Sequence, residues 1–396
     1  MGMITILLCC LSPLGAQATV DPTYAVDRVN WAKMLGRHDL RWDRLPQTWD
    51  EAPFLGNGEL GTMMTQVNAR EVRFDVGCSA AHDHRPAAAD DLGEKHVEVL
   101  NRGRLFIGHM RLATPADIVG GAVDLRLFDA QAAGTLRSAS GELRWKAVVH
   151  ATEPTMYFES TATGDLKGAT WGYVPEEARN PRAIRAKSPR VPANPAAVVD
   201  QLESQGIQRS THTLHAGGQT AVAWKKEASG PSTRVWLSVQ HSFPGLEAGS
   251  RAVTAVRNAS ECDQDQWLKR HRDWWHAYYP ASLVSTGSGY WDSFYWIQQY
   301  KIACATRDKG WIIDNQGPWL QPTAWNATWW NLNVQLAHSG AYQANRRGMA
   351  SALSHGLSKH RAHLALNVAE PYRKDSYAIG RSASGWDLIG HAGEPG

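Results

Sequence analysis

The sequence has little excess charge of either sign, and this limits the partners that it can bind. Its 396 residues carry 41 Lys and Arg against 38 Asp and Glu, a formal net charge of +3. Proteins that bind nucleic acids or anionic membranes through charge carry a clear basic excess. The composition therefore excludes a charge-driven nucleic-acid partner and favours an uncharged ligand.

Long apolar runs and regularly spaced cysteines are also missing. No stretch approaches the roughly 20 apolar residues that cross a bilayer, so we expect no transmembrane segment. Beyond the N-terminal leader the cysteines are Cys78, Cys262 and Cys304, whose wide spacing matches neither a disulfide framework nor a metal site. We expect three buried free thiols.

Metal and cofactor motifs are equally scarce. His82 and His84 stand two residues apart without further spaced ligands, which predicts a polar loop near a ligand rather than a metal site. The glycines of 56–61 are not followed by the helix and Lys-Ser/Thr pair of a phosphate-binding loop. We therefore expect neither a metal nor a cofactor.

The N-terminus resembles an export signal. Met1 to Ala18 contains a short apolar run, then a helix breaker and Ala-Gln-Ala, the small-x-small pattern of a signal-peptidase site, although a positive leading region is missing. A start codon placed slightly too late would explain that omission. We expect cleavage after Ala18 and a periplasmic or secreted protein.

Tryptophan is the residue in greatest excess, with 18 in the chain. Five of them lie between Trp311 and Gln335, together with four asparagines, three glutamines and a single charged residue, Asp314. Cores are built mainly from aliphatic side chains and surface loops carry charge, so this mixture is typical of neither. The alternative is that these tryptophans are wedged between helices.

The mixture suits a concave site for a neutral saccharide. A sugar has an apolar face that lies on an aromatic ring and a rim of hydroxyls that amides bind as donors and acceptors. Within 311–335 we predict Trp319 and Trp325 as stacking residues and Gln335 as a contact to sugar hydroxyls. Oligosaccharides or polysaccharides are therefore the expected partners.

Short alternating runs predict an antiparallel β-sandwich in the first part of the chain. Glu71 to Val76 alternates like a half-buried strand, and Leu-Gly-Asn-Gly at 55–58 has the composition of a turn between two strands. Similar runs continue to about Ser242, interrupted by the basic, proline-rich 177–197, which we interpret as an irregular excursion.

The composition changes near Gly249 and becomes helical. Asp263 to Tyr279 has acidic residues in its first turn and an apolar stripe of Trp267, Trp274 and Tyr278. Further helices are predicted over 290–306, 329–336 and 342–360, so we expect only helices after residue 260.

Several of these segments together resemble glycoside hydrolase family 95, the inverting α-L-fucosidases and α-L-galactosidases. The stretch W-D-E-A-P-F-L-G-N-G-E-L-G-T-M-M at 49–64 is similar to the motif that opens the family, with Pro53 and Phe54 shuffled. D-N-Q-G-P-W at 314–319 and W-N-L-N-V-Q at 330–335 are similar to later family motifs, in family order. The matches span 49 to about 346.

The resemblance implies a multidomain β + α architecture. The expected parts are a signal peptide (1–18), an antiparallel β-supersandwich N-terminal domain (19–248), a helical linker (249–285) and the start of an incomplete (α/α)6 catalytic barrel (286–396). The family's general acid and base lie further along the barrel than residue 396. The resemblance therefore predicts a fragment that is inactive alone.

The resemblance also implies roles for individual residues. Asn331 and Asn333 match the paired asparagines that hold and polarise the attacking water, and Gln316 lies in a matching substrate-binding motif. A carboxamide oxygen accepts a hydrogen bond from water without adding charge, which agrees with this role. The expected activity is inverting hydrolysis of α-L-fucosides or related α-L-glycosides.

Two other functions stay open. A non-catalytic carbohydrate-binding remnant would keep the tryptophan-lined half-site without the carboxylates. A polysaccharide lyase also pairs a helical toroid with a β-sandwich, but it needs a Tyr or His base and places the toroid first, which is opposite to the order expected here.

Overall fold

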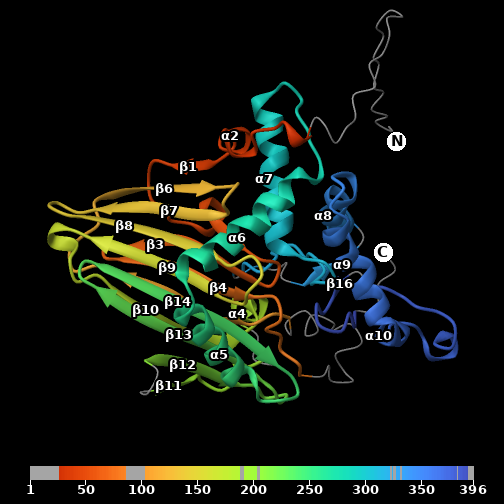
Figure 1. The fold of residues 1–396 in the computed structure, drawn as a ribbon. Helices are drawn as coiled ribbons and strands as arrows, with labels where there is room; N and C mark the ends of the chain where they lie inside the picture. Colours follow the sequence, from red (N-terminus) through yellow and green to blue (C-terminus); the bar gives the residue numbers. More distant parts are fainter. Residues whose placement is uncertain are drawn as a thin grey trace, which may run out of the picture.

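In the computed structural model the chain folds into two packed β-sheets and a group of helices (Figure 1). The structure describes residues 26–85, 103–187, 191–202, 206–321, 323, 327–330, 332–380 and 382–390. The leader predicted at 1–18 lies outside these residues. The predicted end of the β-rich region is confirmed, because the last long strand ends at Ser242.

All neighbouring strands in the two sheets are antiparallel. In spatial order the larger sheet contains β1 (Leu40–Trp42), β6 (Gly120–Arg126), β7 (Gln131–Arg137), β8 (Glu142–Val149), β9 (Met156–Ala162), β14 (Ser232–Ser242), β13 (Gln219–Ser229), β12 (Ile207–Thr213) and β11 (Val198–Leu202). The smaller sheet contains β10 (Thr170–Arg179), β5 (Phe106–Ala113), β4 (Glu71–Cys78), β3 (Leu60–Asn68) and β2 (Phe54–Gly56).

Aromatic side chains fill the space between the two sheets. Phe74 on β4 packs edge-to-face against Trp145 on β8 and Phe158 on β9, with ring centroids 5.2 Å apart in both pairs. All three side chains are buried. Alternation along β4 turns Val72, Phe74 and Val76 inward, as the pattern of the sequence predicts. The sheets therefore form a β-sandwich with one shared core.

Helix α5 (Ala248–Glu261) covers the outer face of the larger sheet rather than leading away from it (Figure 1). Its alanines and valines, such as Ala252 and Val256, pack with Tyr157 and Trp236 of the sheet in a second buried cluster. Small side chains allow the helix to lie close to the strands. The polar side of α5 is left facing solvent.

Helix α6 (Gln264–Tyr278) confirms the helix predicted over 263–279. The Asp263 side chain accepts hydrogen bonds from two backbone N–H groups of the first turn, which is a strong N-cap. The buried stripe contains Trp267 and Tyr278 as predicted, but Trp275 rather than Trp274 is fully buried in it. Trp274 is instead partly covered by Arg307, whose guanidinium lies 3.9 Å from the ring centroid.

The helices that follow lie together at one end of the sandwich (Figure 1). They are α7 (Gly289–Ala305), α8 (Leu332–Gln343), α9 (Arg347–Lys359) and α10 (Arg361–Leu366). Two further short helices, α2 (Trp31–Leu35) and α4 (Pro181–Ala186), belong to the β-rich part. Among the helices of the described residues, none combines the length and apolar composition that crossing a bilayer requires.

Three details differ from the sequence predictions. The region after residue 260 is not purely helical, because β15 (Thr328–Trp329) pairs with β16 (Ser382–Ala383) and α8 begins only at Leu332. The excursion at 177–197 contains α4, which Asn180 caps. Strands β10 and β11 lie outside the strand-like runs that we predict, and pairing with β5 and β12 positions them.

Glycines bring the smaller sheet into direct contact with the segment after α7. Gly61 on β3 and Gly77 on β4 are cross-strand partners. A Cβ added at Gly77 would lie 1.7 Å from the Pro318 carbonyl oxygen, which no real side chain allows. Glycine is therefore required there for the sandwich and the helical end to meet.

Replacing Gly77 by alanine is expected to lower the free energy of unfolding by about 1–3 kcal/mol, because the backbone must separate to admit the methyl group. Gly172 on β10 of the same sheet is a matched control, since a Cβ there meets nothing within 4 Å. Urea unfolding of both variants measures the difference. Equal destabilisation by the two substitutions would contradict the contact.

Candidate functional site

A rigid turn between β2 and β3 forms one wall of the candidate site. The Asn57 side chain accepts hydrogen bonds from the backbone N–H groups of Glu59 (3.1 Å) and Leu60 (2.8 Å). Its amide nitrogen donates to the carbonyls of His150 (2.9 Å) and Glu153 (3.2 Å). One buried side chain therefore shapes the turn and joins it to the loop after β8.

The same turn is joined to the C-terminal end of α7. The Gly58 N–H donates to the Cys304 carbonyl (2.8 Å), and Gly58 has a φ of +92°, a backbone conformation that favours glycine. The Tyr300 hydroxyl donates to the Phe54 carbonyl at 3.1 Å. The glycines of the 55–58 motif thus serve both the predicted turn and the junction with the helical end.

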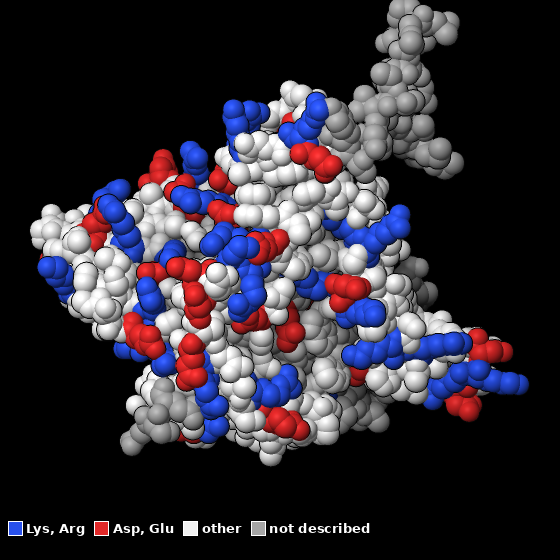
Figure 2. All heavy atoms as spheres, in the orientation of Figure 1, with Lys and Arg blue, Asp and Glu red and all other residues white. Residues whose placement is uncertain are grey.

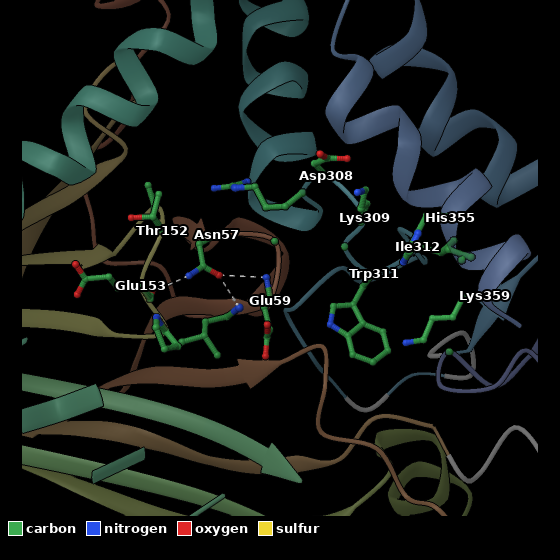
Figure 3. Close-up of a pocket in the computed structure, with 18 of the residues that line it drawn as sticks. Asn57, Glu59, Thr152, Glu153, Asp308, Lys309, Trp311, Ile312, His355 and Lys359 are labelled. Carbon is green, nitrogen blue, oxygen red and sulfur yellow. Dashed lines mark hydrogen bonds between the residues drawn. The ribbon is translucent and has the colours of Figure 1, made fainter. Parts of the chain in front are cut away.

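A cavity of about 750 Å³ opens between this turn and the helical end, and we call it the junction cavity. Its size is within the usual range for small-molecule sites. Loops of the sandwich, the segment after α7 and the end of α9 all contribute to it (Figure 3). Its lining includes Asn57, Gly58, Glu59, Leu60, Ala151, Thr152, Glu153, Pro154, Gln240, Arg251, Trp274, Arg307, Asp308, Lys309, Gly310, Trp311, Ile312, His355, Gly356, Lys359, His360, Gly385 and Leu388.

Glu59 offers the junction cavity a carboxyl group that is not engaged by the protein. Its side chain is exposed in the cavity, and among the described residues it has no hydrogen-bond or ion-pair partner. Protein surrounds it closely enough that desolvation raises its pKa, which the charge of Arg251 opposes in part. An unpaired carboxyl in a cavity can bind ligand hydroxyls or hold a proton for a ligand oxygen.

The other carboxylates of the lining are engaged by protein groups. Glu153 accepts hydrogen bonds from the Trp267 indole N–H (2.6 Å) and the Arg270 guanidinium (2.9 Å). Asp308 accepts one from the Ser351 hydroxyl at 2.6 Å. Glu59 is therefore the carboxylate of this lining that is most available to a ligand.

Aromatic and basic groups face Glu59 from the helical side. In Figure 3 the Trp311 ring lies between Glu59 and the Lys359 side chain of α9. Trp311 is half-buried, and His82 stacks on it with ring centroids 5.3 Å apart. The cavity thus combines an aromatic surface with hydrogen-bonding groups on opposite walls. Figure 2 shows acidic and basic side chains interspersed over this side of the molecule.

A buried ion pair fixes the segment that carries Trp311. The Arg104 guanidinium donates to both carboxylate oxygens of Asp314, at 2.8 and 2.6 Å. Asp314 also accepts hydrogen bonds from the backbone N–H groups of Gln316 and Gly317. Desolvation raises the pKa of Asp314, and Arg104 opposes that shift. The single charged residue of the tryptophan-rich segment is therefore an anchor to the sandwich.

Histidines and aromatic rings pack beside this anchor. The Nε2 atoms of His84 and His241 lie 2.7 Å apart, and the His241 Nδ1 lies 2.8 Å from the Thr220 hydroxyl. His84 also stacks on Phe243 at a centroid distance of 3.8 Å and meets the edge of Trp386. The loop at 82–84 was predicted to lie near a ligand, and the structure places His82 against the cavity residue Trp311.

Burial keeps this histidine pair neutral. Desolvation lowers the pKa of His84 to about 4 and that of His241 to about 3. Asp83 and Asp387 oppose the shift at His84, whereas Arg251 and the neighbouring histidine add to the shift at His241. Both groups therefore stay uncharged at neutral pH.

These lowered pKa values predict a loss of stability in acid. Below pH 6.5 the unfolded chain takes up protons that the folded chain refuses, so the free energy of unfolding falls as the pH drops towards 4. Each pKa unit corresponds to about 1.4 kcal/mol. Urea midpoints at pH 7 and 4.5 measure the fall. His84→Gln keeps a hydrogen-bonding group without the titration, so its midpoints should differ less than those of the wild type. An unchanged difference would contradict this account.

Two predicted ligand contacts lie outside the junction cavity, where the smaller sheet meets the segment after α7. Trp319 is only 6% exposed, and its indole N–H donates to the Leu55 carbonyl at 2.8 Å. Its ring packs edge-to-face on Phe54 at 5.3 Å. Gln316 is 5% exposed beside Asp314. Neither side chain lines the junction cavity in this conformation.

Two further predicted residues lie in the first turns of α8. Asn333 and Gln335 are exposed on the first turns of that helix and do not line the junction cavity. Trp325 and Asn331 lie outside the described residues. The four members of the predicted set that the structure describes therefore do not line the junction cavity, and the catalytic and binding roles of the whole set stay predictions.

Sequence reasoning did not select Glu59 or Lys359 as site residues. Glu59 lies within the glycine-rich motif, and the glycines of that motif predict a turn rather than a binding site. The available signal was a charged side chain at the tip of that turn, next to Asn57. Within the described residues, no group of three or more His, Cys, Asp or Glu side chains is arranged to hold a metal.

Comparison with known proteins supports the architecture. A putative kojibiose phosphorylase from the human microbiome has a similar structure, with a TM-score of 0.52 and 10% identity over 86% of this chain and 47% of that chain. A bacterial glucoamylase in complex with acarbose gives a TM-score of 0.46 and 8% identity over 87% and 55%. The chain thus spans about half the length of these two structures.

No protein-family model matches the sequence, and no curated protein matches it. The structural likeness shows the fold alone, which is a β-sandwich followed by a helical region. The closure of a barrel and the resemblance to glycoside hydrolase family 95 are not tested by this likeness.

Proposed function

We propose that this chain is part of an exported glycoside hydrolase that cleaves α-L-fucosides or related α-L-glycosides with inversion. Its substrate would be an oligosaccharide or polysaccharide met in the periplasm or outside the cell. The proposal joins the sequence resemblance to the position of the junction cavity. The fold is shared with a protein whose name, putative kojibiose phosphorylase, is that of an enzyme acting on a saccharide.

The observation that carries the proposal is the lining of the junction cavity. It combines the Trp311 ring, an unpaired carboxyl at Glu59 and the ammonium group of Lys359 in a space of about 750 Å³. An uncharged sugar can stack on the ring while its hydroxyls bind the polar groups.

The resemblance supplies the chemistry of the proposal. Inversion needs a water on one face of the anomeric carbon and a carboxylic acid that protonates the leaving oxygen on the other. The resemblance assigns the positioning of that water to Asn331 and Asn333, and the proposal takes Trp311, Glu59 and Lys359 of the junction cavity as the contacts to the sugar. The acid and base belong to motifs that the resemblance expects beyond residue 396.

A panel of nitrophenyl glycosides tests the proposal on the natural gene product that contains this chain. We expect release of nitrophenol from the α-L-fucoside or the α-L-galactoside and far less from β-linked and D-sugar controls. Binding of fucosides without any turnover would instead support the carbohydrate-binding alternative. Release from other glycosides alone would contradict the proposed specificity.

A further inference from the structure

A second cavity adjoins the junction cavity. It has a volume of about 680 Å³ and lies between the loop after β8 and helices α5 and α6; we call it the α5 cavity. The two cavities share Glu153, Pro154, Gln240 and Arg251 in their linings. They are therefore neighbouring cavities with these four residues between them.

An uncharged polar stripe of α5 borders the α5 cavity. Ser250, Thr254 and Asn258 are spaced four residues apart, so they lie on one face of the helix, and all three are exposed. The opposite face of α5 packs on the larger sheet. At 1.5 Å per residue the stripe is about 12 Å long, which is enough for more than one linked monosaccharide.

The charged groups of the α5 cavity, Glu153, Arg251 and Arg270, all have hydrogen-bond partners in the protein. Arg270 donates to Glu153 at 2.9 Å, and Arg251 donates to the Gln240 side-chain oxygen at 2.7 Å. Beside them the exposed face of α5 presents the hydroxyl and amide groups of Thr254, Ser250 and Asn258. Such groups bind the hydroxyls of a neutral sugar chain in both directions, as donors and as acceptors.

We propose that the junction cavity and the α5 cavity form one groove for a neutral oligosaccharide chain. The terminal sugar lies beside Trp311, and the following sugars run past Arg251 along Ser250, Thr254 and Asn258. This inference rests on the proposed function, because it extends the same site. It gives α5, a helix that otherwise only covers the sheet, a role in recognising the length of the substrate.

Calorimetric titration of the protein with ligands of increasing length tests the groove. The probes are methyl α-L-fucopyranoside, the trisaccharide 2′-fucosyllactose and a fucosylated hexasaccharide. We expect at least one of the longer ligands to bind about tenfold more tightly than the monosaccharide, which corresponds to about 1.4 kcal/mol. Thr254→Trp fills the α5 cavity and should reduce that ratio to within about twofold, while monosaccharide affinity stays unchanged.

Thr213→Trp is the matched control, because Thr213 is exposed on β12 and lines neither cavity. It should keep the full length dependence. Equal affinity of the wild type for all three ligands would overturn the groove and leave the proposed function standing. An equal loss of affinity for all three ligands in Thr254→Trp would have the same meaning. A protein that binds none of the ligands would overturn the proposed function and the groove together.

Discussion

Replacing Arg104 by methionine is expected to lower the free energy of unfolding by about 3–5 kcal/mol at neutral pH. The substitution removes the guanidinium that donates to both oxygens of the Asp314 carboxylate and leaves that carboxylate buried without its counter-charge. Breaking a buried ion pair on one side is strongly destabilising for this reason. Urea or thermal unfolding at pH 7 measures the effect.

The effect of Arg104→Met should also depend on pH in a defined direction. Burial already raises the pKa of Asp314, and loss of Arg104 raises it further. A carboxyl with a raised pKa in the folded chain binds its proton more tightly there than in the unfolded chain. The destabilisation is therefore largest at neutral pH and becomes smaller as acid protonates Asp314.

Asp314→Asn in the Arg104→Met background provides the control. The asparagine Oδ1 can still accept the hydrogen bonds that Gln316 and Gly317 donate to Asp314, and it carries no charge. The double variant should regain most of the lost stability. If Arg104→Met unfolds at the wild-type midpoint, the ion pair does not anchor the tryptophan-rich segment.

Alanine at Asn333 is expected to lower turnover by about 100-fold or more in the natural gene product. In the proposed mechanism its amide helps to hold the attacking water, and loss of such positioning groups has effects of this order. The Asn333 side chain is exposed on α8, so the free energy of unfolding should hardly change. Asn331→Ala is expected to lower turnover by a similar factor, because the resemblance gives it the same role.

The control for Asn333→Ala is Gln343→Ala at the exposed C-terminal end of the same helix. It removes a similar amide where no role is proposed, so turnover should stay normal. Steady-state kinetics on the nitrophenyl α-L-fucoside, together with thermal unfolding, separates a catalytic effect from a folding effect. Near-normal turnover of Asn333→Ala would remove this residue from the mechanism.

Much of the β-sandwich could be predicted because its strands alternate. In β8 apolar and polar residues alternate from Glu142 to Lys146, and Gly141 precedes the strand, so the local pattern is enough to identify it. β10 and β11 were missed because pairing with other strands, rather than local pattern, determines their position. Pairing between strands that lie far apart in the sequence cannot be read from the local pattern of either strand.

The candidate site was predicted less well, for a physical reason. A tryptophan is the same letter in the sequence whether its ring contacts a sugar or packs against a neighbouring sheet. Trp319 is buried at the junction, where its N–H satisfies the Leu55 carbonyl, whereas Trp311 lines the cavity. The partner that separates these two outcomes lies more than two hundred residues earlier in the chain, in the glycine-rich turn around Asn57.

The central claim is that a neutral saccharide binds in the junction cavity against Trp311. Its most direct test is the affinity of α-L-fucosides for the Trp311→Ala variant, measured beside Trp291→Ala, which removes a surface tryptophan that is 57% exposed on α7. We predict that Trp311→Ala loses binding at least tenfold while Trp291→Ala binds like the wild type. Unchanged affinity of Trp311→Ala, in a protein that folds normally, would contradict the account.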